Sequence, residues 1–139
     1  MIRPAEPADY HALRAIQEAA LDEYWPELLE LGVDGPPICL VVETDRPLGY
    51  ALVVGGDDVA YVAELAVTPA EQGQGYGSEL LAALLDRLRP AGFETIRLTA
   101  RADDDRVRSF YETFGFDVVD EVADHYDGDG DAVVLARSL

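Results

Sequence analysis

Residues 59–88, VAYVAELAVTPAEQGQGYGSELLAALLDRL, decide the fold of this chain. Residues 59–67 form a nearly unbroken apolar run, which predicts a central strand that is buried on both faces. From Ser78 to Arg89 leucines recur at helical spacing and predict a strongly amphipathic helix. Three glycines lie between these two elements: Gly73, Gly75 and Gly77.

A glycine-rich loop at the start of a helix is suited to bind an anion. Backbone N–H groups and the positive end of the helix dipole point at one spot, and the missing side chains let a ligand approach. A nucleotide P-loop is excluded because it ends in Gly-Lys-Ser/Thr, and this chain has no Lys. The G-x-G-x-G spacing also differs from the dinucleotide fingerprint. Taken alone, the loop is also compatible with a flexible surface turn.

Working outward, the remaining elements follow from similar patterns. Strand patterns occupy residues 2–4, both sides of a hairpin that turns at 45–47, 93–101, 116–122 and 132–137. Helix patterns occupy residues 10–21, where Asp9 is expected to cap the first turn, 23–31, and a short stretch that ends at Gly115. The order β-α-α-β-β-β-α-β-α-β-β predicts an α+β fold with helices on both faces of a mixed sheet. The segment from the central strand to 93–101 is a parallel crossover, which predicts an opening in the middle of the sheet.

Length and composition set further limits. A chain of 139 residues is long enough for one domain, expected over residues 1–139. No apolar run reaches the roughly 18 residues of a membrane span, and the first residues do not resemble a signal peptide, so the cytoplasm is the expected location. The lone Cys39 excludes disulfide scaffolds and multi-cysteine metal sites, and its apolar surroundings predict a buried thiol.

The charge is strongly one-sided. There are 28 acidic and 10 basic residues, every basic residue is Arg, and the net charge is −18. This charge should repel nucleic acids and anionic membranes. An acidic excess without Lys resembles adaptation to a salt-rich cytoplasm, where ions screen the self-repulsion. The chain is expected to be a monomer or a homodimer.

Two motifs in this order resemble the GNAT superfamily of N-acetyltransferases. The loop reads Q-x-x-G-x-G after a strand that ends V-x-P, similar to the family's acetyl-coenzyme A signature. The segment SFYETFGFDVV, residues 109–119, is similar to the family's late F-Y-x-x-x-G-F block. The resemblance extends over nearly the whole chain, and residues 125–139 resemble ribosomal-protein N-terminal acetyltransferases. It implies a mostly antiparallel sheet of about seven strands flanked by about four helices.

The resemblance also implies how acetyl-CoA is held. Backbone groups of Leu65 and Val67 would pair with the pantetheine arm like an added strand. Family members often carry Asn where this chain has Asp104, so Asp104 is a further candidate contact. Arg106 and Arg108 either add positive potential or pair with surface carboxylates. The pyrophosphate would be held by backbone N–H groups of Gln72, Gly73, Gln74, Gly75, Tyr76 and Gly77.

Acetyl transfer to an amine needs a group that takes the amine's proton and an acid that protonates the leaving thiolate. The resemblance places Tyr111 in the acid position; the alternative is a packed aromatic residue. Glu64, the only charge in the apolar strand, is the candidate base, because burying a carboxylate without a partner costs free energy and is therefore expected mainly at a functional site. The alternative is an ion pair of Glu64 with an Arg such as Arg101.

The acceptor side carries fewer signals. Tyr61 and Tyr126 are weaker candidates for the acceptor cleft, and His125 is a candidate contact or a surface histidine. In the ribosomal-protein subgroup a catalytic Glu lies on the strand after the glycine helix, and this chain has Thr99 there.

These observations predict an acetyl-CoA-dependent N-acetyltransferase, with direct attack by the amine of a peptide N-terminus or of a small molecule such as a polyamine or an antibiotic. No metal is expected. The alternative from another class is a coenzyme-A-binding regulatory module without turnover.

Overall fold

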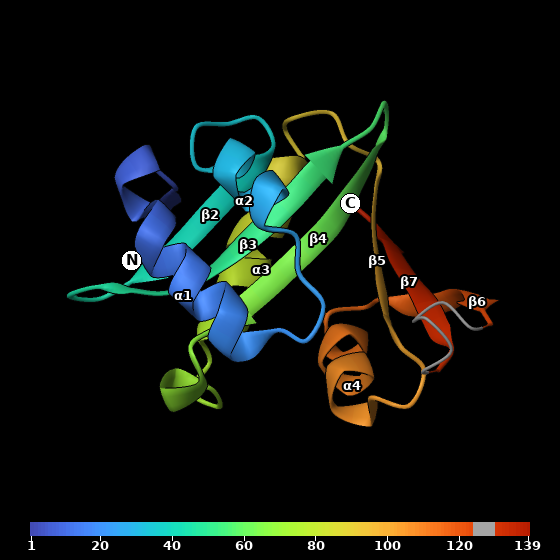
Figure 1. The fold of residues 1–139 in the computed structure, drawn as a ribbon. Helices are drawn as coiled ribbons and strands as arrows, with labels where there is room; N and C mark the ends of the chain where they lie inside the picture. Colours follow the sequence, from blue (N-terminus) through green and yellow to red (C-terminus); the bar gives the residue numbers. More distant parts are fainter. Residues whose placement is uncertain (124–129) are drawn as a thin grey trace.

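The computed structural model describes residues 1–123 and 130–139, and it contains one seven-stranded sheet (Figure 1). Neighbouring strands are antiparallel except for β4 and β5, so the predicted mixed, mostly antiparallel α+β sheet is confirmed. The fourth strand occupies the middle of the sheet, as its apolar run predicts. Its predicted burial on both faces is wrong, because buried residues alternate along the strand with the exposed Tyr61 and Ala63. In spatial order the strands are β1 (Ile2–Pro4), β2 (Ile38–Glu43), β3 (Pro47–Gly55), β4 (Val59–Val67), β5 (Thr95–Arg101), β7 (Ala132–Ser138) and β6 (Asp117–Val122).

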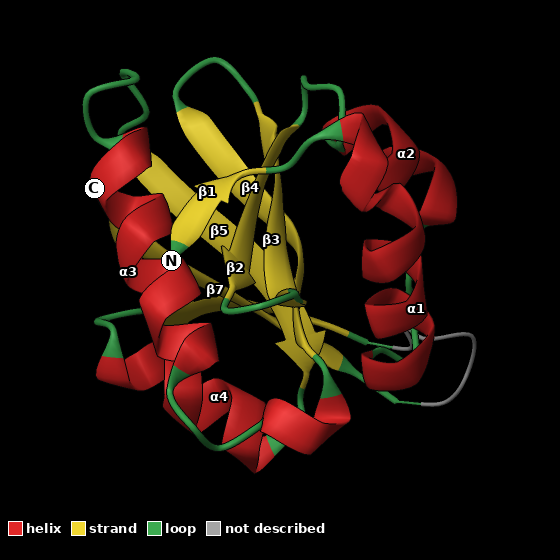
Figure 2. Ribbon diagram, turned by 90° about the vertical axis from the view of Figure 1, so that its left-hand side faces the viewer, coloured by secondary structure: helices red, strands yellow, loops and turns green. Residues whose placement is uncertain are grey.

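Helices cover both faces of the sheet (Figure 2). On one face α1 (Tyr10–Ala20) and α2 (Pro26–Gly32) enclose a small core that includes Tyr50 of β3. On the other face the leucines of α3 (Tyr76–Leu88) and the aromatic residues around α4 (Asp105–Thr113) form the larger core. Two short 3-10 turns, η1 (Pro7–Asp9) and η2 (Pro69–Glu71), precede α1 and the glycine loop.

A β-bulge in β4 decides which face each of its side chains meets. Leu52 pairs with Glu64 while the next residue, Val53, pairs with Val62, so Ala63 is the extra residue. Before the bulge Val62 packs in the core under α3, whereas Glu64, two residues later, lies on the face covered by α1. Residues two apart share a face in a regular strand, so the bulge is what places these two side chains on opposite faces.

The sheet opens between its two parallel strands. β4 and β5 pair over only three positions, Val59–Tyr61 with Thr95–Arg97, and β5 then continues alongside β7. Figure 1 shows the two strands diverging toward α4. The backbone of β4 from residue 62 on therefore has no strand partner on that side among the described residues. The predicted opening in the middle of the sheet is present.

Two local predictions are wrong. Asp9 stands just before α1, but its side chain makes no capping bond to α1; it accepts hydrogen bonds from Arg3 and from the backbone N–H of Glu6 at the start of η1. The second helix begins at Pro26 rather than Glu23. Proline restricts the residue before it to extended backbone, and Trp25 has φ −131° and ψ 89°. Residues 21–25 form the α1–α2 connection instead.

Two expectations about single residues and segments have clear outcomes. Cys39 is buried, and burial raises the pKa of its thiol to about 12, as expected for an unreactive cysteine. No helix among the described residues is long and apolar enough to cross a membrane. His125 and Tyr126 lie outside the described residues.

Candidate active site

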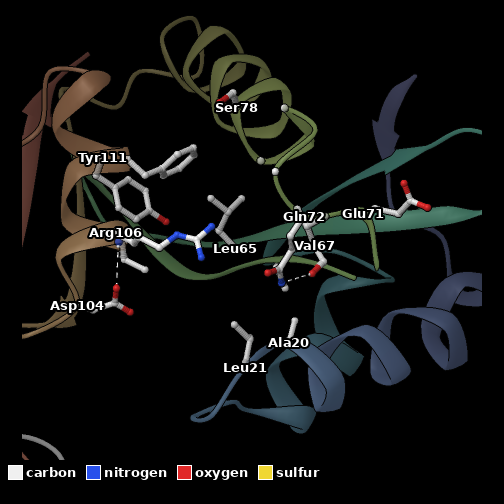
Figure 3. A pocket seen from close by; sticks show the side chains of 16 residues that line it. Ala20, Leu21, Leu65, Val67, Glu71, Gln72, Ser78, Asp104, Arg106 and Tyr111 are labelled. Atoms are coloured by element: carbon white, nitrogen blue, oxygen red, sulfur yellow. Dashed lines mark hydrogen bonds between the residues drawn. The ribbon is translucent and has the colours of Figure 1, made fainter. Parts of the chain in front are cut away.

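Two clefts flank the gap between β4 and β5. The glycine-loop cleft, about 610 Å³, is bordered by the glycine loop, the end of β4, α4 and the end of α1 (Figure 3). The α1–α2 cleft, about 410 Å³, lies among the α1–α2 connection, β4 and β5. Six residues line both clefts: Ala20, Leu21, Leu65, Asp104, Val107 and Tyr111.

The glycine loop presents backbone rather than side chains to its cleft. Gly73 and Gly75 have φ of +82° and +92°, in the left-handed region, and a Cβ at either position would point into open space. The first backbone bond of α3 runs from Glu79 N–H to the carbonyl of Gly75. The N–H groups of residues 76–78 consequently have no acceptor within the helix. This arrangement of free N–H groups at the start of a helix is suited to an anion.

Most residues predicted to hold the coenzyme lie at this cleft, though not all. Leu65, Val67, Gln72, Gly73, Gly75, Gly77 and Asp104 line it. Gln74 and Tyr76 do not: the side chain of Gln74 bonds to Glu71, and Tyr76 packs against the core. Their backbone groups still belong to the loop.

The end of β4 and the loop are tied together. The side-chain amide of Gln72 donates to the carbonyl of Val67 over 2.9 Å, a bond visible in Figure 3. The backbone N–H of Gln72 bonds to Pro69, at 3.4 Å, so this group is partly engaged. The donors that remain begin at Gly73.

The two arginines of α4 differ in position. Arg106 lines the glycine-loop cleft, and Figure 3 shows it reaching with Tyr111 toward Leu65. Arg108 instead donates to the carbonyl of Ala102 and does not line either cleft. Asp104 caps α4 by accepting from the Val107 N–H. Arg106 is therefore the cation available to an anion in this cleft.

Tyr111 stands where the two clefts meet. It is 6% exposed and packs edge-on against Phe110 and Phe116, which fixes its ring. Burial raises the pKa of its hydroxyl, so the proton stays on the oxygen at neutral pH. The ring is thus packed as the alternative predicts, and Tyr111 also lines both clefts.

Glu64 lines the α1–α2 cleft, and it has partners. Its Oε1 accepts from Gln17 Nε2 at 2.8 Å and from the Tyr50 hydroxyl at 2.7 Å. Its Oε2 accepts from the backbone N–H of Trp25 at 2.7 Å. The alternative of an ion pair with Arg101 is wrong, since Arg101 pairs with Glu23 of the α1–α2 connection. Glu64 is a hydrogen-bonded carboxylate and not an isolated charge.

Comparison with known proteins identifies the family. The sequence profile of the acetyltransferase (GNAT) family matches residues 4–116. The chain belongs to the GNAT family. It is 30% identical, over the whole of both chains, to a ribosomal protein bS18-alanine N-acetyltransferase of Haemophilus ducreyi.

Solved structures agree with this assignment. The ribosomal-protein-S18-alanine N-acetyltransferase of Escherichia coli is 27% identical with a TM-score of 0.89, covering 99% of this chain and 92% of that one. Ard1 from Thermoplasma volcanium is 25% identical with a TM-score of 0.90, covering 100% and 97%. This GNAT chain is an acetyl-CoA-dependent N-acetyltransferase.

Sequence reasoning missed several residues of the GNAT site. Gln17, Tyr50 and the Trp25 N–H surround Glu64 from three separate segments, and no short motif contains them. Thr99 lies on β5 at the α1–α2 cleft, as the family comparison places it. Tyr61 does not line either cleft and is 47% exposed.

Proposed function

We propose that this enzyme acetylates the α-amino group of a protein or peptide N-terminus, bound in the α1–α2 cleft. The observation that carries the proposal is the junction of the two clefts at Tyr111, with carboxylates along the acceptor side. These carboxylates favour an acceptor that is positively charged in solution. The names of the relatives, which are alanine N-acetyltransferases of a ribosomal protein, support the same acceptor class. The carboxylates lining the α1–α2 cleft are Asp22, Glu23, Glu64 and Asp104.

We propose that the glycine-loop cleft holds the donor mainly through backbone. Acetyl-CoA supplies the acetyl group as an activated thioester. N–H groups from Gly73 onward and the start of α3 would hold its pyrophosphate, with Arg106 adding a charge. The unpaired edge of β4 at Leu65 and Val67 offers backbone groups to an extended chain, in the way an edge strand accepts a partner.

Transfer by direct attack assigns one role to Glu64 on the acceptor side and another to Tyr111 where the two clefts meet. The amine nitrogen bonds to the acetyl carbon while the carbon–sulfur bond breaks. Glu64 takes the amine's proton through a water molecule, using Oε2, which accepts one described hydrogen bond where Oε1 accepts two. Tyr111 donates its proton to the sulfur, which leaves as a thiol.

The test compares acceptors of different classes. Purified enzyme with acetyl-CoA is given peptides with free N-termini, the same peptides with blocked N-termini, and polyamines, and thiol release is followed with mass analysis of the product. Acetylation of free N-termini alone supports the proposal. Faster turnover of polyamines would replace it with a small-amine acceptor. Binding of acetyl-CoA without thiol release on any amine would instead support the regulatory module.

We also infer that the enzyme works in a salt-rich cytoplasm. The net charge of −18 and the absence of Lys support this, because screening relieves repulsion between surface carboxylates. The melting temperature should rise steeply between low and molar potassium chloride. A flat dependence would contradict the inference.

A further inference from the structure

We propose that Tyr50 and Gln17 are positioning residues: by holding Glu64 they fix the α1–α2 connection as the wall of the acceptor site. This proposal rests on the proposed function, in which the α1–α2 cleft receives the acceptor. It assigns no chemistry to Tyr50 or Gln17. Their effect on the reaction passes through Glu64 and Trp25.

The two oxygens of Glu64 face different parts of the protein. Oε1 is held by Gln17 from α1 and by Tyr50 from β3, both 0% exposed. Oε2 receives the N–H of Trp25, the last residue of the α1–α2 connection. A carboxylate fixed at one oxygen presents the other in a defined direction, so the buried donors determine where the Trp25 backbone lies.

The orientation of Gln17 is fixed in turn. Arg14 donates to its Oε1 at 2.9 Å, which leaves the amide nitrogen to face Glu64. Arg14 also pairs with Glu18 and lies over the ring of Tyr24, 5.7 Å from the centroid. One arginine therefore orients Gln17 and contacts the α1–α2 connection from outside.

The α1–α2 connection is consequently attached at successive residues. Trp25 bonds to Glu64 on β4, Tyr24 lies under Arg14 on α1, and Glu23 pairs with Arg101 at the end of β5. Residues 21–23 line the α1–α2 cleft, so these attachments determine the shape of one of its walls.

Stability alone gives a weak reason for this cluster. Gln17, Tyr50 and Glu64 lie in the smaller core, whose other members are apolar residues such as Leu13 and Leu52. Replacing a buried polar group and its partners by well-packed apolar residues is often neutral or stabilising. Positioning of the connection explains why a satisfied carboxylate with two buried donors occupies this place.

The chain carries its own reporter for this proposal. Trp25 is the single tryptophan, and it is 60% exposed. Its fluorescence therefore reports on the α1–α2 connection alone. Freeing the connection should change the quenching of this fluorescence by acrylamide, independently of any catalytic assay.

The experiment is the Tyr50→Phe variant, which removes one buried hydroxyl and keeps the ring. We expect the KM for an acceptor peptide to rise about tenfold, because the variant loses one hydrogen bond to a charged group. The Kd of acetyl-CoA should stay within about twofold, since the glycine-loop cleft is unchanged, and quenching of Trp25 should increase. The matched control is Tyr61→Phe, another sheet tyrosine that lines neither cleft, which should change none of the three quantities.

A folded Tyr50→Phe variant with wild-type acceptor KM and wild-type quenching overturns the proposal. If this variant does not fold, Arg14→Met tests it from the surface, with Arg89→Met, another intrahelical ion-pair arginine, as control. Arg14→Met should raise the acceptor KM and Trp25 quenching in the same direction, and wild-type values of both overturn the proposal. If wild-type enzyme acetylates no N-terminus, the proposed function fails, while the quenching measurement still decides whether Tyr50 holds the connection.

Discussion

The two clefts that meet at Tyr111 are built from different parts of the chain. The glycine-loop cleft offers backbone: N–H groups at the start of α3 and the unpaired edge of β4. The α1–α2 cleft offers side chains, chiefly Glu64 with its buried donors and the Glu23–Arg101 pair. A backbone site tolerates change in most side chains and depends on a few conformations. A side-chain site depends on the identity of several residues that are far apart in the chain.

Tyr111→Phe acts at the junction and should have the largest effect. The ring remains packed against Phe110 and Phe116, so folding should survive. Loss of the proton donor should lower kcat by roughly 10²–10⁴ while the Kd of acetyl-CoA stays near wild type. Steady-state kinetics and calorimetric titration measure the two, with Tyr10→Phe as control. Near-normal kcat would reassign Tyr111 to packing alone.

Glu64→Gln tests the acceptor side and should have the next largest effect. The variant keeps the shape, removes the charge and replaces one accepting oxygen by an amide nitrogen, and kcat/KM at neutral pH should fall by about ten- to a hundredfold. Part of the loss should return at higher pH, where more of the amine is already deprotonated. The measurement is a pH–rate profile beside that of Glu30→Gln, an exposed glutamate on α2. Superimposable profiles for Glu64→Gln and wild type would exclude Glu64 as base and as electrostatic guide.

Gly75→Ala tests the backbone side. A methyl group should obstruct the approach of the pyrophosphate and weaken acetyl-CoA binding by about tenfold, or 1.4 kcal/mol. The control is Gly92→Ala, because Gly92 has a similar φ of +95° and similarly open surroundings but lies away from both clefts. Both variants should lose about 1–2 kcal/mol of unfolding free energy through left-handed backbone strain. Equal coenzyme affinities in the two would remove Gly75 from the binding site.

Salt should act with opposite sign on the two clefts, with the smallest effect of the four. Screening weakens the attraction between acidic residues and a cationic acceptor, so the acceptor KM should rise by about threefold from low to molar potassium chloride. The donor is an anion that the net charge of −18 repels at long range, while short-range dipoles hold it. Added salt screens the repulsion, so the Kd of acetyl-CoA should fall. Parallel titrations of acetyl-CoA and peptide measure both. Changes of the same sign would mean that the clefts do not differ in charge.

The same contrast explains what the sequence could predict. Gly73, Gly75 and the late F-Y block are local signals, and the structure places them at one cleft as expected. The strand order follows from local apolar patterns as well. By contrast, Gln17 lies 47 residues from Glu64 and Trp25 lies 39 residues away, and only the fold brings them together.

Local propensity also misplaced two features at the starts of α1 and α2. The residues from Glu23 to Trp25 are expected to be helical, but proline and the Trp25–Glu64 bond hold Trp25 outside the helical conformation. Asp9 has the residue type of a helix cap, yet Arg3 offers it a charged partner, which lowers the pKa of Asp9. In both places a polar contact with a residue outside the helix outweighed the local preference.

The extra residue at Ala63 decides which face of the sheet the Glu64 side chain meets. Burial alternates regularly through Ala60, Val62, Glu64 and Ala66, so the bulge is invisible in the hydrophobic pattern. In a β4 of the same length without the bulge, Glu64 would share the face of Val62, and its carboxylate would lie in the leucine layer under α3. The number of β4 residues that stand opposite β3, rather than their kind, therefore decides whether Glu64 lines the cleft or lies without hydrogen-bond partners in the apolar core.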